Sequence, residues 1–342
     1  MTPLTSLQNV CIAGLATLDA PHRVLSADIG EQLAPTLVRL GLDSHTLETL
    51  TGIVARRFWD DGVQPSSVAA RAGVLAMRDA HIDKSQVGLL INTSVCKDYI
   101  EPSVASLVHG LLGLSPDCQN FDVGNACLGF LDAMRIAGLM IEQRRVDYAL
   151  IVNGEGSRYI TEQTVQRLLA AGTNFETFRR NFAALTLGSG AVAMVLAHAG
   201  LVPRGPRLLG SVQQTASQHS RLCLGQPDEM TADPQQLLVA GLQLAGRTFS
   251  KYFTATGSSV HDIDHLVIHQ ISAKHTDQFI KRLQARNESV YRLYPEFGNL
   301  GPASVPTVLS KLVEEGKIAR GNRVVLAGIG SGLNCAVMGV EW

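Results

Sequence analysis

Short apolar runs alternate with longer segments of helical periodicity along most of the chain. The short runs predict buried strands, and the longer segments predict helices. In the first part of the chain, the predicted strands are Val10–Leu15, Val87–Asn92, Gln119–Asp122, Tyr148–Asn153 and Ala191–Leu196. The predicted helices there are Ser67–Ala80, Ser103–Leu112 and Cys127–Arg144. Strands separated by helices indicate βαβ units and largely parallel sheets, and therefore an α/β protein.

The second part of the chain repeats this order of elements. Its predicted strands are Arg207–Gln214, His265–His269, Val290–Leu293, Arg323–Gly328 and Ala336–Glu341. Its predicted helices are Gln235–Thr256, Lys274–Leu283 and Ser304–Glu315. Each part closes with two successive strands, so we interpret the chain as a βαβαβαββ unit that occurs twice, with little similarity between residues. We predict two domains, residues 1–200 and 201–342, joined near Ala199–Pro206.

Three polar residues follow strands of these two units. Cys127 follows the third strand of the first unit, and Asn299 follows the third strand of the second. His269 ends the second strand of the second unit. Ligands of open α/β sheets collect at the carboxyl ends of parallel strands. We therefore expect these three side chains to lie in one site.

Cys127 precedes a helix that is apolar in nearly every direction, Leu128–Arg144. Such a helix is buried on all sides. The free N–H groups and the dipole at a helix N-terminus favour an anion, so the thiol pKa is expected to fall from ~8.5 toward ~3.5–7.5. The alternative for any cysteine in apolar surroundings is a small buried hydrophobe, which is our interpretation of Cys11, Cys118 and Cys335.

The combination of Cys, His and Asn is typical of acyl transfer. The Cys127 thiolate takes an acyl group as a thioester, while N–H groups of His269 and Asn299 stabilise a second acyl carbonyl as an enolate. The glycine-rich segment Gly328–Leu333 lets the backbone approach a ligand closely. We expect the backbone N–H groups of Ser331 and Cys127 to hold the oxyanion of the first thioester.

Composition excludes several other classes of protein. The net charge of −1 gives no global attraction to nucleic acid or to an anionic membrane. The six cysteines show no close pairing, which is typical of a reducing, cytoplasmic compartment, and Cys96 and Cys223 receive no role. The uncharged stretch Ala183–Val202 fits a loop and a buried strand better than a membrane span. No HExxH or complete dinucleotide fingerprint occurs, so we predict no metal and no cofactor.

Four motifs occur in the same order in a known family. They are NACLGF around Cys127, VIHQIS around His269, GNLGPASVP around Asn299, and GIGSGLNCAV near the C-terminus. Together they resemble the ketoacyl synthase III branch of the thiolase superfamily over essentially the whole chain. The resemblance implies a five-layer αβαβα fold, a homodimer and acyl thioester substrates.

Within this branch, the segment INTSVCKDYIEPSVAS, Ile91–Ser106, resembles OleA, the head-to-head acyl-CoA condensing family of long-chain olefin biosynthesis. The resemblance implies two long-chain acyl-CoA substrates, downstream olefin-pathway enzymes as partners, and a glutamate, here Glu101, that reaches the neighbouring subunit's site. Taking a proton from an unactivated α-carbon requires a base, and a carboxylate whose pKa is raised by burial suits that task. The alternative for Glu101 is an exposed acid before a helix that starts at Pro102.

Three functions therefore stand beside one another. The first is a non-decarboxylative Claisen condensation of two acyl-CoAs to a 2-alkyl-3-ketoacyl product. The second is a 3-oxoacyl-carrier-protein synthase III, or an alkylpyrone or resorcinol synthase, with a malonyl or β-ketoacyl partner. The third is a non-catalytic acyl-binding subunit, against which the intact set of Cys127, His269 and Asn299 argues. Arg56 and Arg57 are candidates for a contact with a CoA phosphate, or are simply surface charges.

Overall fold

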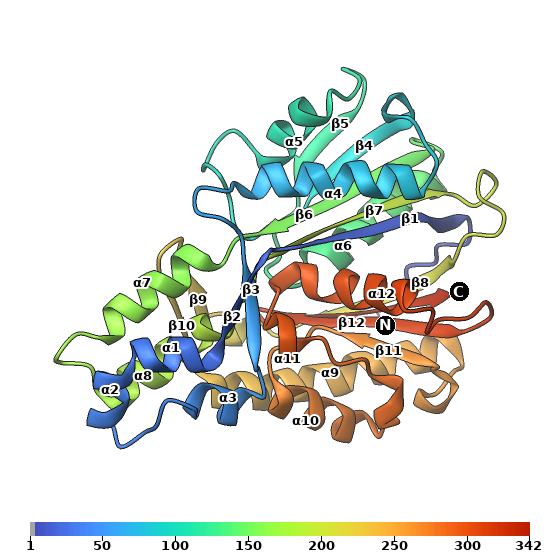
Figure 1. The fold of residues 1–342 in the computed structure, drawn as a ribbon. Coiled ribbons are helices and arrows are strands. Elements are labelled where there is room, and N and C mark those ends of the chain that lie inside the picture. The colour runs from blue at the N-terminus through green and yellow to red at the C-terminus, as the bar shows by residue number, and fades with distance from the viewer. Residues whose placement is uncertain (1–3) are drawn as a thin grey trace.

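A nine-stranded mixed sheet runs through the computed structural model, which describes residues 4–342 (Figure 1). Its order is β11-β12-β13-β8-β1-β7-β6-β4-β5. These strands are β1 (Val10–Asp19), β4 (Val87–Asn92), β5 (Gln119–Asp122), β6 (Tyr148–Glu155), β7 (Gly190–His198), β8 (Arg207–Thr215), β11 (His265–Ile268), β12 (Arg323–Gly330) and β13 (Asn334–Glu341). Two small two-stranded sheets pair β2 (His22–Leu25) with β3 (Ala55–Phe58), and β9 (Cys223–Gly225) with β10 (Met230–Ala232), the latter pair as a hairpin.

Helices cover the outer faces of the two parts of this sheet, and two further helices lie between these parts. They are α1 (Ser26–Gln32), α2 (Ala34–Arg39), α3 (Thr46–Thr51), α4 (Pro65–Asp79), α5 (Val104–Leu112), α6 (Gly129–Glu142), α7 (Arg158–Leu168), α8 (Phe175–Asn181), α9 (Pro234–Thr256), α10 (Ala273–Leu283), α11 (Tyr294–Phe297) and α12 (Ser304–Glu314). Short 3-10 helices occupy Lys84–Gln86, Phe182–Thr186, Ser217–His219, Val260–Asp262, Asn287–Ser289 and Gly301–Ala303.

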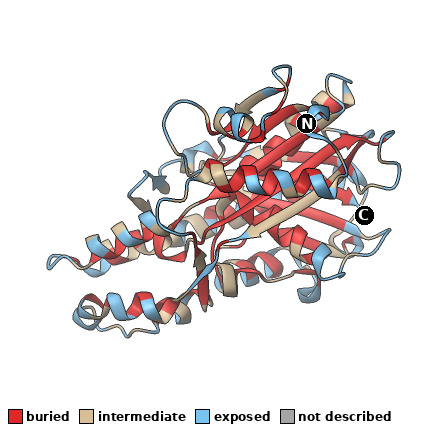
Figure 2. Cartoon of the chain, turned by 45° about the horizontal axis from the view of Figure 1, so that its top comes forward, coloured by how far each residue is buried: buried red, intermediate tan, exposed pale blue. Residues whose placement is uncertain are grey.

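The predicted five-layer αβαβα arrangement is confirmed. β1 and β8 pair at a single position, Cys11 with Arg207, so the long sheet divides there into two parts. α6 packs on β4, β6 and β7 of one part and on β12 of the other, while α12 contacts β1, β7, β11 and β12. These two helices form the central layer, with α4 and α5 outside one part and α9 and α10 outside the other (Figure 1). Figure 2 shows that buried residues concentrate in the strands and in the inner faces of the helices.

The two parts share a topology except at one predicted strand. The first part has the order β5-β4-β6-β7-β1, and the second has the corresponding order β11-β12-β13-β8 without a counterpart of β5. The prediction of a strand at Val290–Leu293 is wrong, because these residues form no regular structure although Val290 and Leu293 are buried. The Gln270 side chain forms the backbone hydrogen bonds that a neighbouring strand would otherwise form. Its oxygen accepts from the N–H groups of Leu293 (2.8 Å) and Tyr294 (3.1 Å), and its NH2 group donates to the Tyr291 carbonyl.

The central helix α6 differs in two ways from its prediction. It begins at Gly129, so Cys127 precedes the helix by two residues. Its first six residues are buried, but Leu139 near its end is exposed, so burial on all sides holds only for the part next to Cys127. The apolar stretch from residue 183 to 202 contains the end of a 3-10 helix and the fully buried strand β7. Among residues 4–342, no helix combines the length and apolar character needed to cross a bilayer.

A satellite layer lies beside the sheet, built from segments for which the sequence pattern predicted no element. α1–α3, α7 and α8 enclose their own apolar cluster, which includes Ile29, Leu33, Leu37, Leu47, Val165, Leu168, Phe178 and Leu185. The β9–β10 hairpin packs on α8 (Figure 1). This layer adjoins the polar strand ends described below, and α1–α3 and α8, with six or seven residues each, are too short for periodicity to reveal them.

Candidate active site

A tight turn between β5 and α6 holds Cys127. Ala126 has a positive φ of 45°, and the N–H groups of Leu128 and Gly129 donate back to the carbonyls of Asn125 and Ala126. The end of β12 packs against this turn. The approach is so close that a Cβ at Gly330 would lie 2.9 Å from the Asn125 carbonyl oxygen. Glycine is therefore required at that place for backbone to pack on backbone. The predicted strand-to-helix turn at Cys127 is present.

The electrostatics of Cys127 differ from the expectation. Burial raises the pKa of the Cys127 thiol to about 12, and the nearby Cys223 and Glu155 raise it further, while its own backbone N–H lowers it. The expectation of a lowered pKa is therefore wrong for the chain without substrate. Desolvation disfavours the thiolate more strongly than the start of α6, two residues away, favours it.

His269 and Asn299 meet in direct contact. His269 Nε2 lies 3.0 Å from Asn299 Oδ1, and the same oxygen accepts from the Gly301 N–H at 3.0 Å. Because a backbone N–H can only donate, Oδ1 is the acceptor, so His269 donates its Nε2–H and the Asn299 NH2 group is turned away. Burial lowers the pKa of His269, so its ring is neutral at pH 7.

Asn299 is pinned by the other half of the chain. Its N–H donates to the Thr186 carbonyl at 2.8 Å, and its carbonyl accepts from the Gly188 N–H at 2.9 Å. Gly298, with a φ of 66°, makes this approach possible, since a Cβ there would lie 2.6 Å from the Thr186 oxygen. This pairing places Asn299 without the strand that was predicted before it.

Strand β12 joins the two sides of the site. A Cβ at Gly328 would lie 3.6 Å from the His269 Cβ and 2.8 Å from the Leu128 side chain, so this strand fills the space between His269 and the start of α6. Ser331 follows in the turn between β12 and β13, and its side chain lies near enough to Cys223 of β9 to lower the pKa of that thiol, which burial raises. Cys223, for which the sequence suggested no role, thus lies beside both Ser331 and Cys127.

Glu155 is a second residue near Cys127 that the sequence analysis missed. It ends β6, is 5% exposed, and accepts from the N–H groups of Val95 (2.8 Å) and Cys96 (3.3 Å). Burial raises its pKa to about 7. The available signal was an acid at the carboxyl end of a buried apolar strand, YALIVNGE.

Glu101 lies on an anchored but exposed loop. Glu155 holds the start of this loop, and Asp122 holds its end by accepting from the N–H groups of Val104 and Ala105. Between these anchors Glu101 is exposed, and its neighbour Ile100 is 98% exposed. Among residues 4–342, Glu101 forms no hydrogen bond or ion pair. Helix α5 starts at Val104 after an N-cap at Ser103, so Pro102 is not its first residue.

The two arginines considered for a CoA phosphate are engaged elsewhere. Arg56 is 1% exposed and donates to the Leu185 carbonyl at 3.0 Å, so it cannot reach a surface ligand and the expectation fails for it. Arg57 lies over the Phe297 ring, 4.9 Å from its centroid.

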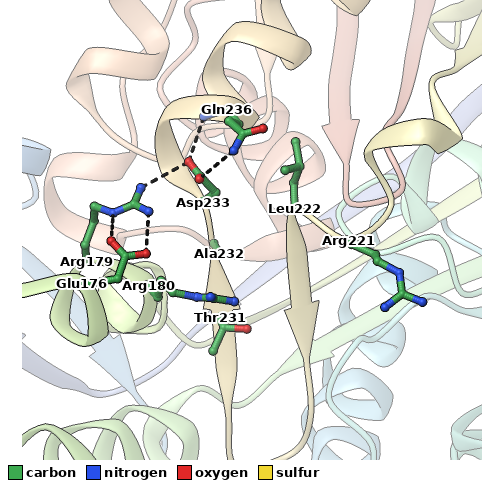
Figure 3. A pocket seen from close by; sticks show the side chains of 9 residues that line it. All are labelled: Glu176, Arg179, Arg180, Arg221, Leu222, Thr231, Ala232, Asp233 and Gln236. Atoms are coloured by element: carbon green, nitrogen blue, oxygen red, sulfur yellow. Dashed lines mark hydrogen bonds and ion pairs between the residues drawn. The ribbon is translucent and has the colours of Figure 1, made fainter. Parts of the chain in front are cut away.

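A different cationic pocket lies between α8, the β9–β10 hairpin and the start of α9 (Figure 3). Its volume is about 190 Å³, and Arg179, Arg180 and Arg221 contribute to its lining. Arg179 is neutralised by Glu176 (2.8 Å) and Asp233 (3.3 Å), whereas Arg180 and Arg221 form no ion pair within the described part of the chain. Leu222 lines this pocket and the next residue, Cys223, lies at Ser331, so β9 borders both the pocket and the Cys127 site.

Comparison with known proteins agrees with this geometry. Residues 121–217 match the 3-oxoacyl-[acyl-carrier-protein] synthase III family, and residues 253–342 match its C-terminal family. The chain is 48% identical over 335 residues to the acyl-CoA:acyl-CoA alkyltransferase of Xanthomonas campestris, covering 98% of this chain and 99% of that protein. It is 33% identical to the acyl-CoA:acyl-CoA alkyltransferase of Shewanella oneidensis, covering 97% and 99%.

A solved structure of X. campestris OleA with bound lauric acid and lauroyl-CoA superposes with a TM-score of 0.96 at 47% identity, covering 98% of this chain and 100% of that one. Other structures of that OleA carry substitutions at a glutamate, a cysteine and a histidine. These three residues are spaced along its chain as Glu101, Cys127 and His269 are spaced along this one.

The fold and the matched regions define the class, which is that of the ketoacyl synthase III-like condensing enzymes of the thiolase superfamily. Identity of 48% over nearly the full length of both chains places the protein within it more closely: the chain belongs to the OleA family of acyl-CoA:acyl-CoA alkyltransferases.

Proposed function

We propose that this enzyme joins two long-chain acyl-CoAs head to head, as the first step of long-chain olefin formation. One acyl group passes to Cys127, and the α-carbon of a second acyl-CoA then attacks that thioester. The new carbon–carbon bond gives a 2-alkyl-3-ketoacyl-CoA. The observation that carries this proposal is the full-length match to acyl-CoA:acyl-CoA alkyltransferases at 48% identity.

The first half-reaction is an exchange of thioesters. The Cys127 sulfur bonds the acyl carbon, the bond from that carbon to the CoA sulfur breaks, and the thiol proton leaves with the departing CoA. Because the pKa of Cys127 is raised, its thiol is protonated before substrate binds. In this proposal the backbone N–H groups of Cys127 and Ser331 stabilise the oxyanion of that step.

The second half-reaction needs an enolate and a base. In this proposal the donors for the enolate oxygen are the NH2 group of Asn299, which does not contact His269, and the Nε2–H of neutral His269, which exchanges its bond to Asn299 Oδ1 for one to the substrate. Each such donor contributes ~2.7–4 kcal/mol in comparable sites. The enolate carbon then attacks the thioester, and the Cys127 thiolate is released as the leaving group.

Glu101 is the proposed base, and it acts in the partner subunit of a homodimer. The loop that carries it is fixed at both ends within its own subunit, while Tyr99, Ile100 and Glu101 project outward. An exposed apolar tip of this kind is typical of a protein–protein interface. In a dimer, burial of Glu101 within the neighbour's site would raise the pKa of the carboxylate and make it a stronger base.

We assign the phosphate-bearing end of CoA to the pocket of Figure 3. Arg180 and Arg221 offer charge without an acidic partner there, and arginine binds phosphate oxygens through charge-assisted hydrogen bonds. Because β9 borders this pocket and the Cys127 site, a substrate held there has its thioester end directed to Ser331 and Cys127.

The test supplies a single long-chain acyl-CoA, such as myristoyl-CoA, with no malonyl donor. We expect release of CoA and, after loss of CO2 from the hydrolysed product, a ketone detected by mass spectrometry. A Cys127→Ala control should give neither. Strict dependence on malonyl-CoA or malonyl-carrier protein would contradict the proposal and favour the synthase III alternative.

A further inference from the structure

We propose that Asn125 is a positioning residue, which holds the turn carrying Cys127 in register with the turn carrying Ser331. It acts through a series of hydrogen-bonded side chains, Thr215–Asn334–Asn125–Asp132, which we call the hydrogen-bond chain. This inference rests on the proposed roles of Cys127 as acyl acceptor and of the two backbone N–H groups as oxyanion donors.

The chain consists of three short side-chain hydrogen bonds. Thr215 Oγ1 donates to Asn334 Oδ1 at 2.7 Å, and Asn334 Nδ2 donates to Asn125 Oδ1 at 2.8 Å. Asn125 Nδ2 then donates to Asp132 Oδ2 at 2.6 Å. Thr215 and Asn334 also pair in the ladder between β8 and β13, so one end of the chain is fixed to the sheet.

Asp132 gives this chain its direction. A carboxylate can only accept, so it fixes the Asn125 amide with its NH2 toward α6 and its oxygen toward Asn334. The same argument then fixes the Asn334 amide. Asp132 is 6% exposed in the first turn of the largely apolar helix α6, with Arg135 of the same helix 3.6 Å away. A buried carboxylate is costly unless it is hydrogen-bonded or paired, so a side chain with a purely packing role would be apolar here.

The two middle members of the hydrogen-bond chain, Asn125 and Asn334, lie at the two turns that must be aligned. Asn125 precedes Cys127 by two residues, and its carbonyl accepts from the Leu128 N–H within the nucleophile turn. Asn334 follows Ser331 by three residues and begins β13. The contact of Gly330 with the Asn125 carbonyl brings the two turns together but does not prevent sliding. The Asn334–Asn125 bond joins them directly, across the boundary between the two parts of the chain.

Alignment of this kind affects rate more than affinity. An oxyanion donor stabilises the transition state only when it lies at hydrogen-bond distance from the position that the oxyanion will occupy. Displacement by 1 Å can cost ~10²-fold in rate. The acyl chain and CoA bind through other groups, so their affinity should not depend on Asn125.

The experiment compares the single-turnover rate of Cys127 acylation, followed by intact mass, with the Kd of a non-transferable thioether analogue of myristoyl-CoA. For Asn125→Ala we expect acylation to slow by about 10²-fold with an unchanged Kd. Asn9→Ala is the matched control, because it removes a bond of similar length, Asn9 Nδ2 to Glu142 Oε1 at 2.9 Å, at the surface. An acylation rate equal to that of this control would overturn the proposal.

An exchange of roles separates positioning from general stability. Asn125→Asp alone opposes two carboxylates and should slow acylation at least as much as the alanine variant. Combined with Asp132→Asn, the carboxylate at 125 can accept from both Asn334 and the new amide, so we expect recovery to within about tenfold of wild type. A double variant as slow as the single one would contradict the inference, whatever its melting temperature. Full acylation of a Cys127→Ala variant would instead refute the proposed function.

Discussion

At the residue scale, two kinds of side chain surround the proposed reaction: those that take part in it, and those that hold its participants in place. Cys127, His269 and Asn299 each belong to a specific motif, Cys127 and His269 also follow a strand, and the structure brings His269 and Asn299 into contact. Glu155 and Asp132 belong to no such motif, and Asn125 opens the motif NACLGF, which does not reveal what its side chain contacts. Their positions depend on side-chain contacts between β6, the nucleophile turn and α6, which a linear pattern does not encode.

Glu155 makes a pH-dependent contribution to stability that can be measured. Its pKa is about 7 in the folded protein and 4.5 without perturbation, so the folded state retains a proton that the unfolded state loses first. This contribution is fully present below pH ~4.5 and is lost as the pH rises through ~7. Glu155→Gln cannot ionise. We therefore expect its free energy of unfolding to gain about 3 kcal/mol relative to wild type between pH 4.5 and 8.

Urea denaturation of both proteins across this pH range is the measurement. Glu31→Gln on the exposed helix α1 is the control, and its curve should run parallel to that of wild type. A constant difference between Glu155→Gln and wild type at every pH would show that folding does not raise the pKa of Glu155.

At the element scale, the alternation of apolar runs and helical patterns located every strand of the main sheet. The prediction failed where a side chain, and not a neighbouring strand, forms the hydrogen bonds to the backbone. Val290–Leu293 has the apolar character of a buried strand, and it is buried, but Gln270 satisfies the backbone groups that a neighbouring strand would otherwise pair. The short helices α1–α3 and the β9–β10 hairpin were missed because each is too short to show a period.

The β9–β10 hairpin carries the next prediction, because it separates the cationic pocket from the Cys127 site. Arg180→Glu combined with Arg221→Glu should raise the KM for myristoyl-CoA roughly tenfold or more, since two phosphate contacts become repulsions. The KM for the N-acetylcysteamine thioester, which lacks phosphate, should not change. Arg320→Glu, an exposed charge change outside this pocket, is the matched control. An equal rise in KM for both substrates would place the effect in the hairpin's structure and not in phosphate binding.

At the scale of the whole molecule, the duplication explains why one site needs residues from both parts of the chain. The turn before α6 carries Cys127 in one part of the chain. In the other part, His269 follows β11 and Asn299 lies in a loop, and β12 packs between His269 and the start of α6. The division into domains at residue 200 stays a prediction, because no observation tests where one unit ends. In the proposed function the exposed loop at Glu101 adds a further step, in which a second copy of the chain completes the site.

Paired variants test that step directly. A heterodimer of one Cys127→Ala subunit and one Glu101→Ala subunit, isolated through two different affinity tags, contains one complete site if Glu101 acts across the interface. We expect condensation at about half the wild-type rate per dimer, because one of the two symmetric sites is intact. Both parent homodimers should fail to condense, although Glu101→Ala should still acylate Cys127.

The mirror-image pairing removes the remaining alternative. The second heterodimer pairs a wild-type subunit with one that carries both Cys127→Ala and Glu101→Ala. Its single remaining Cys127 therefore faces a partner subunit that lacks Glu101. If Glu101 acts across the interface, this heterodimer is inactive in condensation; if Glu101 acts within its own subunit, it keeps about half the activity and the first heterodimer has none. The two heterodimers contain the same substitutions in equal number. Any general loss of stability therefore affects both alike, and only the location of the base distinguishes them.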